Sequence, residues 1–323
     1  MRREGHETLP CPPFNGFLWF SSMAITSAQP VRQWSVLSLL EWTSTHLAEK
    51  KIDEARLTVE LLLAHTLGLR RLDLYLQFDR PLTQKELAAF RQLYERRLAH
   101  EPVQYIIGET EFMGHPFAVD RHALIPRPET EHLVEYALEQ LRASGQETPR
   151  ILEVGSGSGN VAIALALRLR NASVDSMDIH PETLALAQRN NDRNDAHVHF
   201  VQADVFDEVF SGDRFDLIIS NPPYVSAKEF ELLQIEVRDF EPRDAICDDG
   251  DGLRFYRRFM EFAPPRLRES GLLAVEVGFG QADPVARLFR DAGLADVEMK
   301  KDYAGINRIV AGRKKRSIAG DAA

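Results

Sequence analysis

A rigid, polar tetrapeptide, Asn221-Pro222-Pro223-Tyr224, comes directly after an apolar run that ends at Ser220. Proline fixes φ and has no backbone N–H, so such a segment holds its carbonyl acceptors still. The side-chain oxygen of Asn221 and the carbonyl of Pro222 can accept the two N–H hydrogens of an amide or exocyclic amine, and Tyr224 offers a ring face for its planar group. A proline-rich turn with a satisfied Asn is the alternative. The pattern favours a catalytic site for a planar, weakly nucleophilic nitrogen.

A glycine-rich loop, E-V-G-S-G-S-G over residues 153–159, closes one predicted strand and opens a helix. Glycines allow a tight turn and let a ligand approach the backbone closely, as in other α/β nucleotide sites. The G-x-G-x-G spacing differs from the G-x-G-x-x-G of dinucleotide sites, and the charge of Glu153 would repel a pyrophosphate. Both features favour S-adenosyl-L-methionine as the cofactor. The loop residues predicted to bind it are Glu153, Gly155, Ser156, Gly157, Ser158 and Gly159.

Polar residues also end the next three predicted strands. Asp178 stands where a carboxylate can accept both ribose hydroxyls of the cofactor, although it could instead cap the following helix. Asp204 and Val205 end the third strand, where the adenine would lie. Asn221 ends the fourth strand, and open α/β sheets bind ligands at the carboxyl ends of their strands. These residues complete the predicted cofactor site.

The motifs lie in a region where short β-rich runs alternate with helical ones from residue 150 onward. Strands of this kind, such as I-L-E-V, F-D-L-I-I-S and G-L-L-A-V-E-V, predict a mostly parallel sheet covered by helices on both faces. The last segments, around D-V-E-M-K and N-R-I-V-A, predict an antiparallel pair at the sheet edge. The predicted fold class is therefore α/β, with a Rossmann-like sheet.

A helical region precedes the sheet. Thr83 and Glu86 form a capping box that predicts the start of one helix, and a second helix is expected from Asp53 to a C-terminal cap at Gly68. Residues 105–120 put short strand-like runs on either side of Gly114, which predicts a β-hairpin. The predicted domains are a small helical bundle at 32–102, a hairpin linker at 103–127 and a catalytic domain at 128–312.

The two ends of the chain are expected to lie outside the folded domains. Residues 1–31 carry Arg2 and Arg3 ahead of an apolar patch, but acidic residues and prolines interrupt it. They predict a disordered extension, or a start codon assigned too early with Met23 as the real start, rather than a secretory signal. Residues 313–323 predict a solvated tail.

The charge distribution bears on the partner. The formal net charge is −10, and residues 102–323 contain 26 Lys and Arg against 37 Asp and Glu. Such a surface repels phosphate backbones, which argues against nucleic acid as a direct partner. No apolar stretch reaches the length of a membrane span. The cysteines, Cys11 and Cys247, form neither a disulfide framework nor a metal-site spacing, so we expect a metal-free cytoplasmic protein.

The two motifs resemble those of the class I adenosylmethionine-dependent methyltransferases that modify planar nitrogens in DNA adenine, ribosomal RNA guanine or protein glutamine. The segment Glu101 to Glu131, which ends in I-P-R-P-E-T-E, resembles the linker of the HemK/PrmC-type release factor glutamine methyltransferases. So do A-R-L-T-V-E-L-L-L-A-H-T-L-G-L, E-P-R-D-A-I and D-Y-A-G-I-N-R-I-V. The resemblance spans about residues 34–311. Its departures are Glu153 where Asp is commoner, Val205 where an aromatic is common and His115 where Leu is usual.

This resemblance implies an enzyme that moves the methyl group of S-adenosyl-L-methionine to N5 of the glutamine in the Gly-Gly-Gln motif of class-1 peptide-chain release factors, leaving S-adenosyl-L-homocysteine. It implies that Asn221, Pro222, Pro223 and Tyr224 are catalytic and that the bundle docks the protein substrate. A monomer is expected. The segment Ile125 to Glu131 has no assigned role.

Three alternatives remain open at this point. Sister enzymes methylate a glutamine of a ribosomal protein, but they usually have Ser-Pro after the Arg of I-P-R-P-E-T-E. An N6-adenine or N2-guanine methyltransferase shares N-P-P-Y, but it would need a basic groove and a target-recognition domain. A non-catalytic binding module is disfavoured because the glycine loop and the tetrapeptide are both intact.

Overall fold

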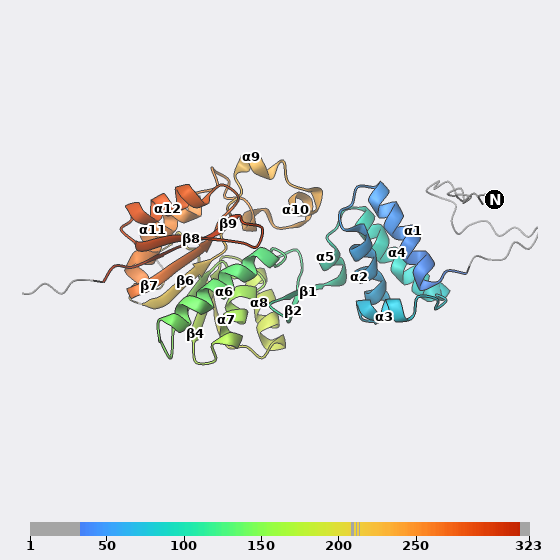
Figure 1. Ribbon diagram of the computed structural model, residues 1–323, viewed down its shortest axis with the longest axis horizontal. Helices are drawn as coiled ribbons and strands as arrows, with labels where there is room; N and C mark the ends of the chain where they lie inside the picture. Colours follow the sequence, from blue (N-terminus) through green and yellow to red (C-terminus); the bar gives the residue numbers. More distant parts are fainter. Residues whose placement is uncertain (1–32, 208–209, 211, 213, 317–323) are drawn as a thin grey trace, which may run out of the picture.

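The structure, a computed structural model, describes residues 33–207, 210, 212 and 214–316. A bundle of short helices lies at one end, a larger part built on a seven-stranded sheet lies at the other, and a two-stranded sheet connects them (Figure 1). The expectations for residues 1–31 and for 317–323 fall outside the described residues. Within the described ranges, no helix is long and apolar enough to cross a membrane.

The bundle forms because amphipathic helices bury their apolar faces together, around residues such as Leu47, Leu62 and Phe90. The predicted capping box is confirmed, since the Thr83 hydroxyl accepts from the Glu86 N–H at 3.2 Å and Glu86 accepts from the Thr83 N–H at 2.8 Å. The second predicted helix also ends at Gly68, whose φ is 64°. The helices are α1 (Val36–Glu49), α2 (Ala55–Leu67), α3 (Arg71–Leu76), α4 (Gln84–Leu98) and α5 (Val103–Ile107).

The linker contains the predicted hairpin. Strand β1 (Glu109–Phe112) pairs antiparallel with β2 (His115–Ala118) across a turn at residues 113–114. The expectation of strand-like structure from residue 105 is wrong for residues 105–107, which belong to α5. They are helical because Ile106 packs into the bundle core, and Gly108, with φ 84°, ends that helix before the hairpin begins.

The large sheet has the strand order β5-β4-β3-β6-β7-β9-β8. The first five strands in this order are parallel, and β9 runs antiparallel to both β7 and β8, so the expected parallel sheet with an antiparallel edge pair is confirmed. The strands are β3 (Arg150–Val154), β4 (Ser173–Asp178), β5 (Val198–Gln202), β6 (Phe215–Ser220), β7 (Leu267–Glu276), β8 (Ala295–Lys301) and β9 (Asn307–Arg313). Strand β9 thus ends one residue inside the segment expected to be a tail.

Helices cover both faces of this sheet because alternate residues of each buried strand point to opposite faces. Ile151 faces a core with α6 and α7, whereas its neighbour Leu152 faces a core with α11 and α12. The helices of this part are α6 (Pro128–Ala143), α7 (Asn160–Arg168), α8 (Pro181–Arg193), α11 (Arg254–Arg266) and α12 (Ala282–Asp291).

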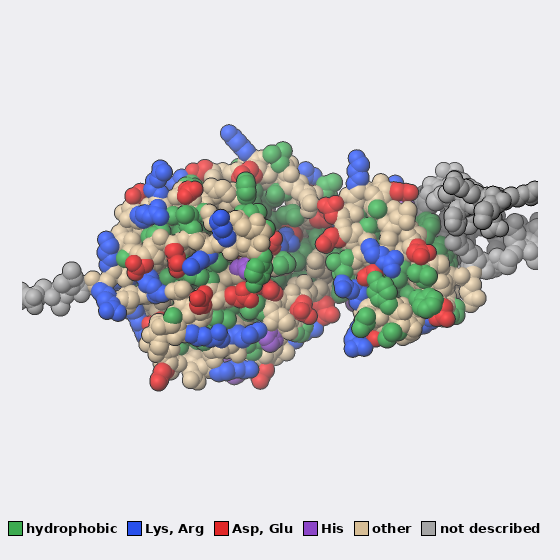
Figure 2. Space-filling model, in the orientation of Figure 1, with side chains coloured by type: hydrophobic (Ala, Val, Ile, Leu, Met, Phe, Trp, Pro, Cys, Tyr) green, Lys and Arg blue, Asp and Glu red, His purple; other side chains and the backbone are tan. Residues whose placement is uncertain are grey.

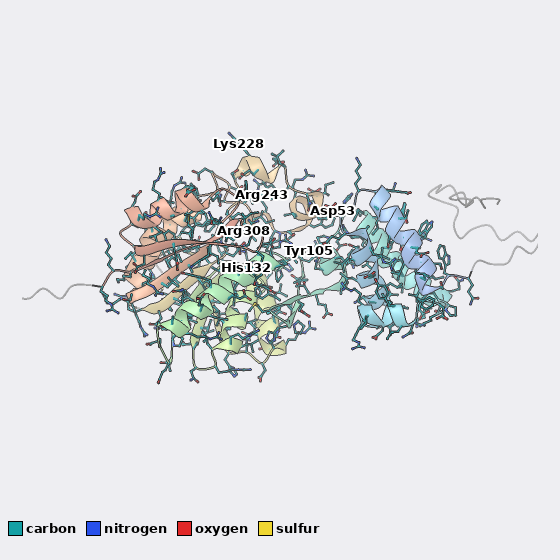
Figure 3. The ribbon with its side chains drawn as sticks, viewed as in Figure 1. Asp53, Tyr105, His132, Lys228, Arg243 and Arg308 are labelled. Carbon is teal, nitrogen blue, oxygen red and sulfur yellow. The ribbon has the colours of Figure 1, made fainter. Side chains whose placement is uncertain are left out.

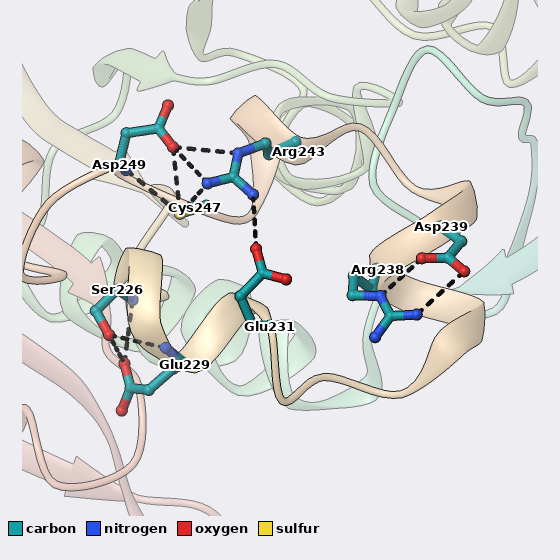
Figure 4. Close-up of polar contacts among 8 residues, drawn as sticks. All are labelled: Ser226, Glu229, Glu231, Arg238, Asp239, Arg243, Cys247 and Asp249. Atoms are coloured by element: carbon teal, nitrogen blue, oxygen red, sulfur yellow. Dashed lines mark hydrogen bonds and ion pairs between the residues drawn. The ribbon is translucent and has the colours of Figure 1, made fainter.

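The segment between β6 and α11 folds over the carboxyl edge of the sheet (Figure 1). It contains α9 (Ala227–Phe230), α10 (Ile235–Phe240) and a 3-10 turn, η1 (Arg243–Ala245). Local polar contacts stabilise it: Arg243 pairs with Asp249 at 2.8 Å and with Glu231 at 3.9 Å (Figure 4).

This segment also contacts the bundle. Glu236 on α10 accepts from Arg97 at 2.9 Å and lies 3.3 Å from the Nδ1 of His100, and Gln234 donates to Asp53 at 3.2 Å. Asp53 and Tyr105 are both labelled on the side of the bundle that faces the sheet (Figure 3). The chain that follows the tetrapeptide therefore touches both parts of the molecule.

Candidate active site

A cavity of about 520 Å³ opens at the carboxyl edge of the large sheet, a size suited to a small organic ligand. The ends of β3, β4 and β6 and the residues after β5 line it, together with the loop 121–127 and with Pro242, Asp244 and Ala245 of the covering segment. Except for Ser158, Gly159 and Tyr224, the predicted site residues are all among its lining. These are Glu153, Gly155, Ser156, Gly157, Asp178, Asp204, Val205, Asn221, Pro222 and Pro223.

The glycine loop turns sharply at the end of β3. The N–H groups of Gly155 and Ser156 both donate to the carbonyl of Met177 on β4, at 2.8 and 3.0 Å, which fixes the loop against the neighbouring strand. Gly155 and Gly157 have φ of 87° and 51°, backbone conformations that residues other than glycine rarely adopt. A Cβ added at either would meet no protein atom within 4 Å, so both glycines leave space for a ligand.

The other two loop residues lie behind this surface. Ser158 is fully buried and its carbonyl accepts from Asn190. Gly159 is the N-cap of α7, and a Cβ there would lie 2.9 Å from Ile163 and 3.2 Å from Ala187. Gly159 therefore permits close packing of α7 on α8, and its backbone shapes the loop from behind.

Glu153 lies beneath the loop and is only 2% exposed. Its carboxyl accepts from the Ser176 hydroxyl at 2.5 Å, and the Ser176 and Ser156 hydroxyls are 2.7 Å apart. Burial raises the pKa of Glu153 to about 8, and the charge of Asp178 adds to the effect. Because this carboxyl is mostly neutral near pH 7, the argument that its charge repels a pyrophosphate does not hold.

Asp178 contacts both the glycine loop and the chain just before α8. One carboxylate oxygen accepts from the Gly157 N–H at 3.1 Å, and the other accepts from the His180 N–H at 3.2 Å, just before α8. Burial raises its pKa, while these backbone donors favour the charged form. Asp178 therefore orients the glycine loop and also presents a carboxylate to the cavity.

The third strand contributes one polar and one apolar group. The Asp204 carboxylate accepts from the Phe206 N–H at 2.9 Å, and Val205, which is 5% exposed, packs into the core beside the cavity. Val205 and Phe206 therefore give this side of the cavity an apolar surface next to the Asp204 carboxylate.

The tetrapeptide places Asn221, Pro222 and Pro223 on the cavity wall. The Asn221 side chain donates through Nδ2 to the Thr130 hydroxyl at 3.1 Å. The Tyr224 ring packs against the core beside Gly278, and its carbonyl accepts from Gln281 at 2.8 Å. The tetrapeptide is therefore fixed on both sides, by α6 and by the chain after β7.

Several contacts around the cavity were not predicted from the sequence. Arg127 forms an ion pair with the buried Glu241 at 2.5 Å, which ties the loop before α6 to the covering segment. The His180 imidazole, after β4, forms a hydrogen bond with Asp244 of the covering segment. The carboxyl of Glu276 lies behind Thr130. Glu276 had a visible signal, a charged residue directly after the apolar run from Leu272 to Val275, whereas the contacts of Thr130 had none.

Comparisons with known proteins agree with this arrangement. Residues 38–108 match the family model of the PrmC N-terminal domain, and residues 131–237 match that of the methyltransferase small domain. The chain is 45% identical over 280 residues to the release factor glutamine methyltransferase of Geobacter sulfurreducens, covering 87% of this chain and 97% of that protein. It is 47% identical over 283 residues to the protein of the same name from Chlorobaculum tepidum, covering 85% of this chain and 96% of that protein.

Among solved structures, the release factor-specific protein-(glutamine-N5) methyltransferase from Alicyclobacillus acidocaldarius is 31% identical to the chain. It covers 62% of this chain and 99% of that chain, with a TM-score of 0.38.

The space in front of Gly157 generates a first prediction. Asn tolerates a positive φ better than most residues, so Gly157→Asn should fold while its side chain fills that space. We expect the affinity for adenosylmethionine, measured by calorimetry, to fall at least about tenfold, or about 1.4 kcal/mol. Gly145→Asn is the matched control, because Gly145 also has a positive φ and open space but lies after α6. Equal affinities in the two variants would refute the assignment.

The burial of Glu153 generates a pH prediction. Its pKa is about 8 in the folded chain against 4.5 for an unperturbed glutamate, so between these values the unfolded state binds fewer protons. The free energy of unfolding of the cofactor-free wild type should therefore fall relative to that of Glu153→Gln as pH rises from 5 to 8, by at most about 1.4 kcal/mol per pH unit. Urea titrations measure it, with the exposed Glu147→Gln as control. Parallel pH curves for wild type and Glu153→Gln would contradict it.

Proposed function

Because the chain belongs to the family of release factor glutamine methyltransferases, we propose that it transfers a methyl group from S-adenosyl-L-methionine to the side-chain amide nitrogen, N5, of a glutamine in a class-1 peptide-chain release factor. By the resemblance described above, this is the glutamine of the Gly-Gly-Gln motif. One feature supports the proposal most strongly: the glycine loop and the acceptor groups of Asn221 and Pro222 line the same cavity.

The residues of this cavity fit the cofactor in size and in chemistry. Gly155 and Gly157 would admit the methionine part close to the backbone, Asp178 would accept the ribose hydroxyls, and the wall at Asp204 and Val205 would hold the adenine. When bound, adenosylmethionine supplies an electrophilic methyl group: the C–S bond breaks and leaves its electron pair on sulfur as a C–N bond forms with the amide nitrogen.

The acceptor groups act on the glutamine amide. Its nitrogen lone pair is delocalised, so the amide has to be held in one orientation to react. The Asn221 oxygen and the Pro222 carbonyl would accept its two N–H hydrogens, while the Tyr224 ring, which packs beside Gly278 outside the cavity lining, would support these groups from behind. No general base is needed, because the nitrogen becomes far more acidic on methylation and loses its proton to water.

The bundle would dock the protein substrate. Its charges nearly balance, and α3 and the turn after it expose four large apolar side chains, Leu72, Tyr75, Leu76 and Phe78. Exposed apolar groups of this kind mark interaction surfaces. The face of the molecule drawn in Figure 2 mixes acidic and basic side chains, and a hollow with hydrophobic side chains separates the bundle from the larger part. A protein loop suits such a surface better than a phosphate backbone does.

Removing the acceptor tests the proposed function. Asn221→Ala should lower the single-turnover rate of release factor methylation by about 100-fold, by analogy with loss of one preorganised polar group from an active site. Adenosylmethionine affinity, measured in parallel, should change far less. A near wild-type rate in this variant would contradict the proposal and would indicate that the tetrapeptide is a rigid turn without a catalytic role.

Tyr224 provides the companion comparison. Tyr224→Phe keeps the ring and should react nearly as fast as the wild type, whereas Tyr224→Ala should be slow because the ring is what supports the acceptor. Equally slow methylation by the two variants would show that the Tyr224 ring has no function in catalysis.

The recognition function of the bundle is tested with a chain that begins at Gly108, where α5 has ended. It should bind adenosylmethionine normally but lose most activity on intact release factor, since docking energy orients the reacting group. Its rate on a short Gly-Gly-Gln peptide should fall much less. Normal methylation of intact factor by this shortened chain would make the bundle a structural element only.

A further inference from the structure

Two buried residues hold the side chain of Asn221 from behind. Asn221 Nδ2 donates to Thr130 Oγ1 at 3.1 Å, and the Thr130 hydroxyl donates to Glu276 Oε2 at 2.7 Å. Thr130 and Glu276 are each 2% exposed. Thr130 reaches the cavity wall, while the Glu276 carboxyl lies behind it and is not part of the cavity lining. The three side chains form one hydrogen-bonded row from the cavity into the core.

The fold brings these residues together from three elements. Glu276 is the last residue of β7, and Ser220 on β6 is paired with Val275, so Asn221 and Glu276 leave neighbouring strands at the same level. Thr130 lies in the first turn of α6, where its N–H donates to the Arg127 carbonyl at 3.1 Å. This turn belongs to the I-P-R-P-E-T-E motif, for which the sequence offered no role.

The Glu276 carboxylate at the buried end of the row sets the donor-to-acceptor direction of both hydrogen bonds. An ionised carboxylate only accepts hydrogen bonds, so it takes the single hydroxyl proton of Thr130. The Thr130 oxygen is then left as an acceptor and selects the NH₂ end of the Asn221 amide. Because the two ends of an amide point in different directions, the Asn221 oxygen is turned away from Thr130.

We propose that Thr130 and Glu276 are positioning residues that fix which way round the Asn221 amide points, so that its oxygen and not its NH₂ group meets the N–H groups of the substrate amide. The inference rests on the proposed function, in which Asn221 accepts from a glutamine amide. If the Asn221 side-chain amide were rotated the other way round, its NH₂ group would face the N–H groups of the substrate glutamine. Two donors would then meet, and the nitrogen that receives the methyl group would not be held in place.

Protonation of Glu276 would remove this control, because a neutral carboxyl can donate to Thr130 and reverse the row. Burial raises the pKa of Glu276 to about 7, against the opposing effect of the Thr130 hydrogen bond. The charged and titratable groups around Glu276 are Arg127, Glu129, Tyr224, Tyr256 and Arg308. Methyl transfer should therefore slow as the pH falls below about 7.

The first experiment compares variants of Thr130 in single-turnover methylation of intact release factor at saturating adenosylmethionine. Thr130→Val keeps the shape but not the hydroxyl, and its rate should fall roughly 10- to 100-fold, as for other residues that orient a reacting group from behind. Thr130→Ser restores the hydroxyl and should stay within about threefold of wild type. Thr43→Val is the matched control, since Thr43 is a buried threonine of the bundle whose hydroxyl donates to the helix carbonyl of Leu39.

The second experiment uses the pH profile, which a merely structural contact would not move. Glu276→Gln can accept or donate at every pH, so its rate should be about tenfold lower at pH 8 and should lack the acid limb of the wild type. Circular dichroism checks that each variant is folded, and its affinity for adenosylmethionine checks that it binds the cofactor.

The outcomes separate this inference from the proposed function. The inference is overturned if Thr130→Val reacts at the wild-type rate while Asn221→Ala is impaired, if Thr130→Ser is as slow as Thr130→Val, or if Glu276→Gln keeps the acid limb. A wild-type chain that leaves release factor unmodified would overturn the proposed function, and this inference with it.

Discussion

The direct pairing of β3 with β6 is the contact on which the site depends. The chain order of the strands is interrupted there, since β4 and β5 lie on one side of β3 while β6 and β7 continue on the other. The pairing of Ile151 with Leu217 brings the glycine loop beside the tetrapeptide, although about sixty residues separate them in the chain. The Ser220 hydroxyl donates to the Val154 carbonyl at 2.7 Å and closes the junction between the two strand ends. The cofactor loop and the acceptor groups therefore share one cavity because two strands share one ladder.

Two buried carboxyls support the two halves of this cavity. Glu153 lies under the glycine loop and bonds to Ser176, and Glu276 lies behind the tetrapeptide and bonds to Thr130. Burial raises the pKa of both, because a charged carboxylate is costly in a core that supplies few donors. Each directly follows apolar residues at or near the end of its strand and is itself buried, so each costs stability that a hydrophobic residue would not. A functional demand for oriented polar groups explains why they are there.

Much of the fold follows from local patterns in the sequence. The alternation of strands and helices, the capping box at Thr83 and the hairpin at Gly114 all depend on residues close together in the chain, and the structure confirms each of them. Residues 105–107 were mispredicted because their apolar run suits a strand or a helix, and only contact with the bundle core decides between them.

Of the candidate site, the sequence predicted strand-end residues that line the cavity but not the buried contacts behind them. Strand-end residues such as Asp178 and Asn221 are recognisable because the carboxyl ends of parallel strands always meet at one edge. The contact of Thr130 with Glu276 joins residues far apart in the chain, and no spacing rule predicts such a pair. The raised pKa of Glu153 was likewise hidden, because a pKa depends on burial by elements distant in sequence.

Tandem mass spectrometry of a purified class-1 release factor, incubated with this chain and adenosylmethionine, tests the central claim most directly. The account predicts one added methyl group, located on the side-chain amide of the glutamine in the Gly-Gly-Gln motif and formed about 100-fold more slowly when Asn221→Ala replaces the wild type under single-turnover conditions. A methyl group on any other residue, or an unmodified release factor together with methyl transfer to DNA, RNA or a ribosomal protein, would contradict it.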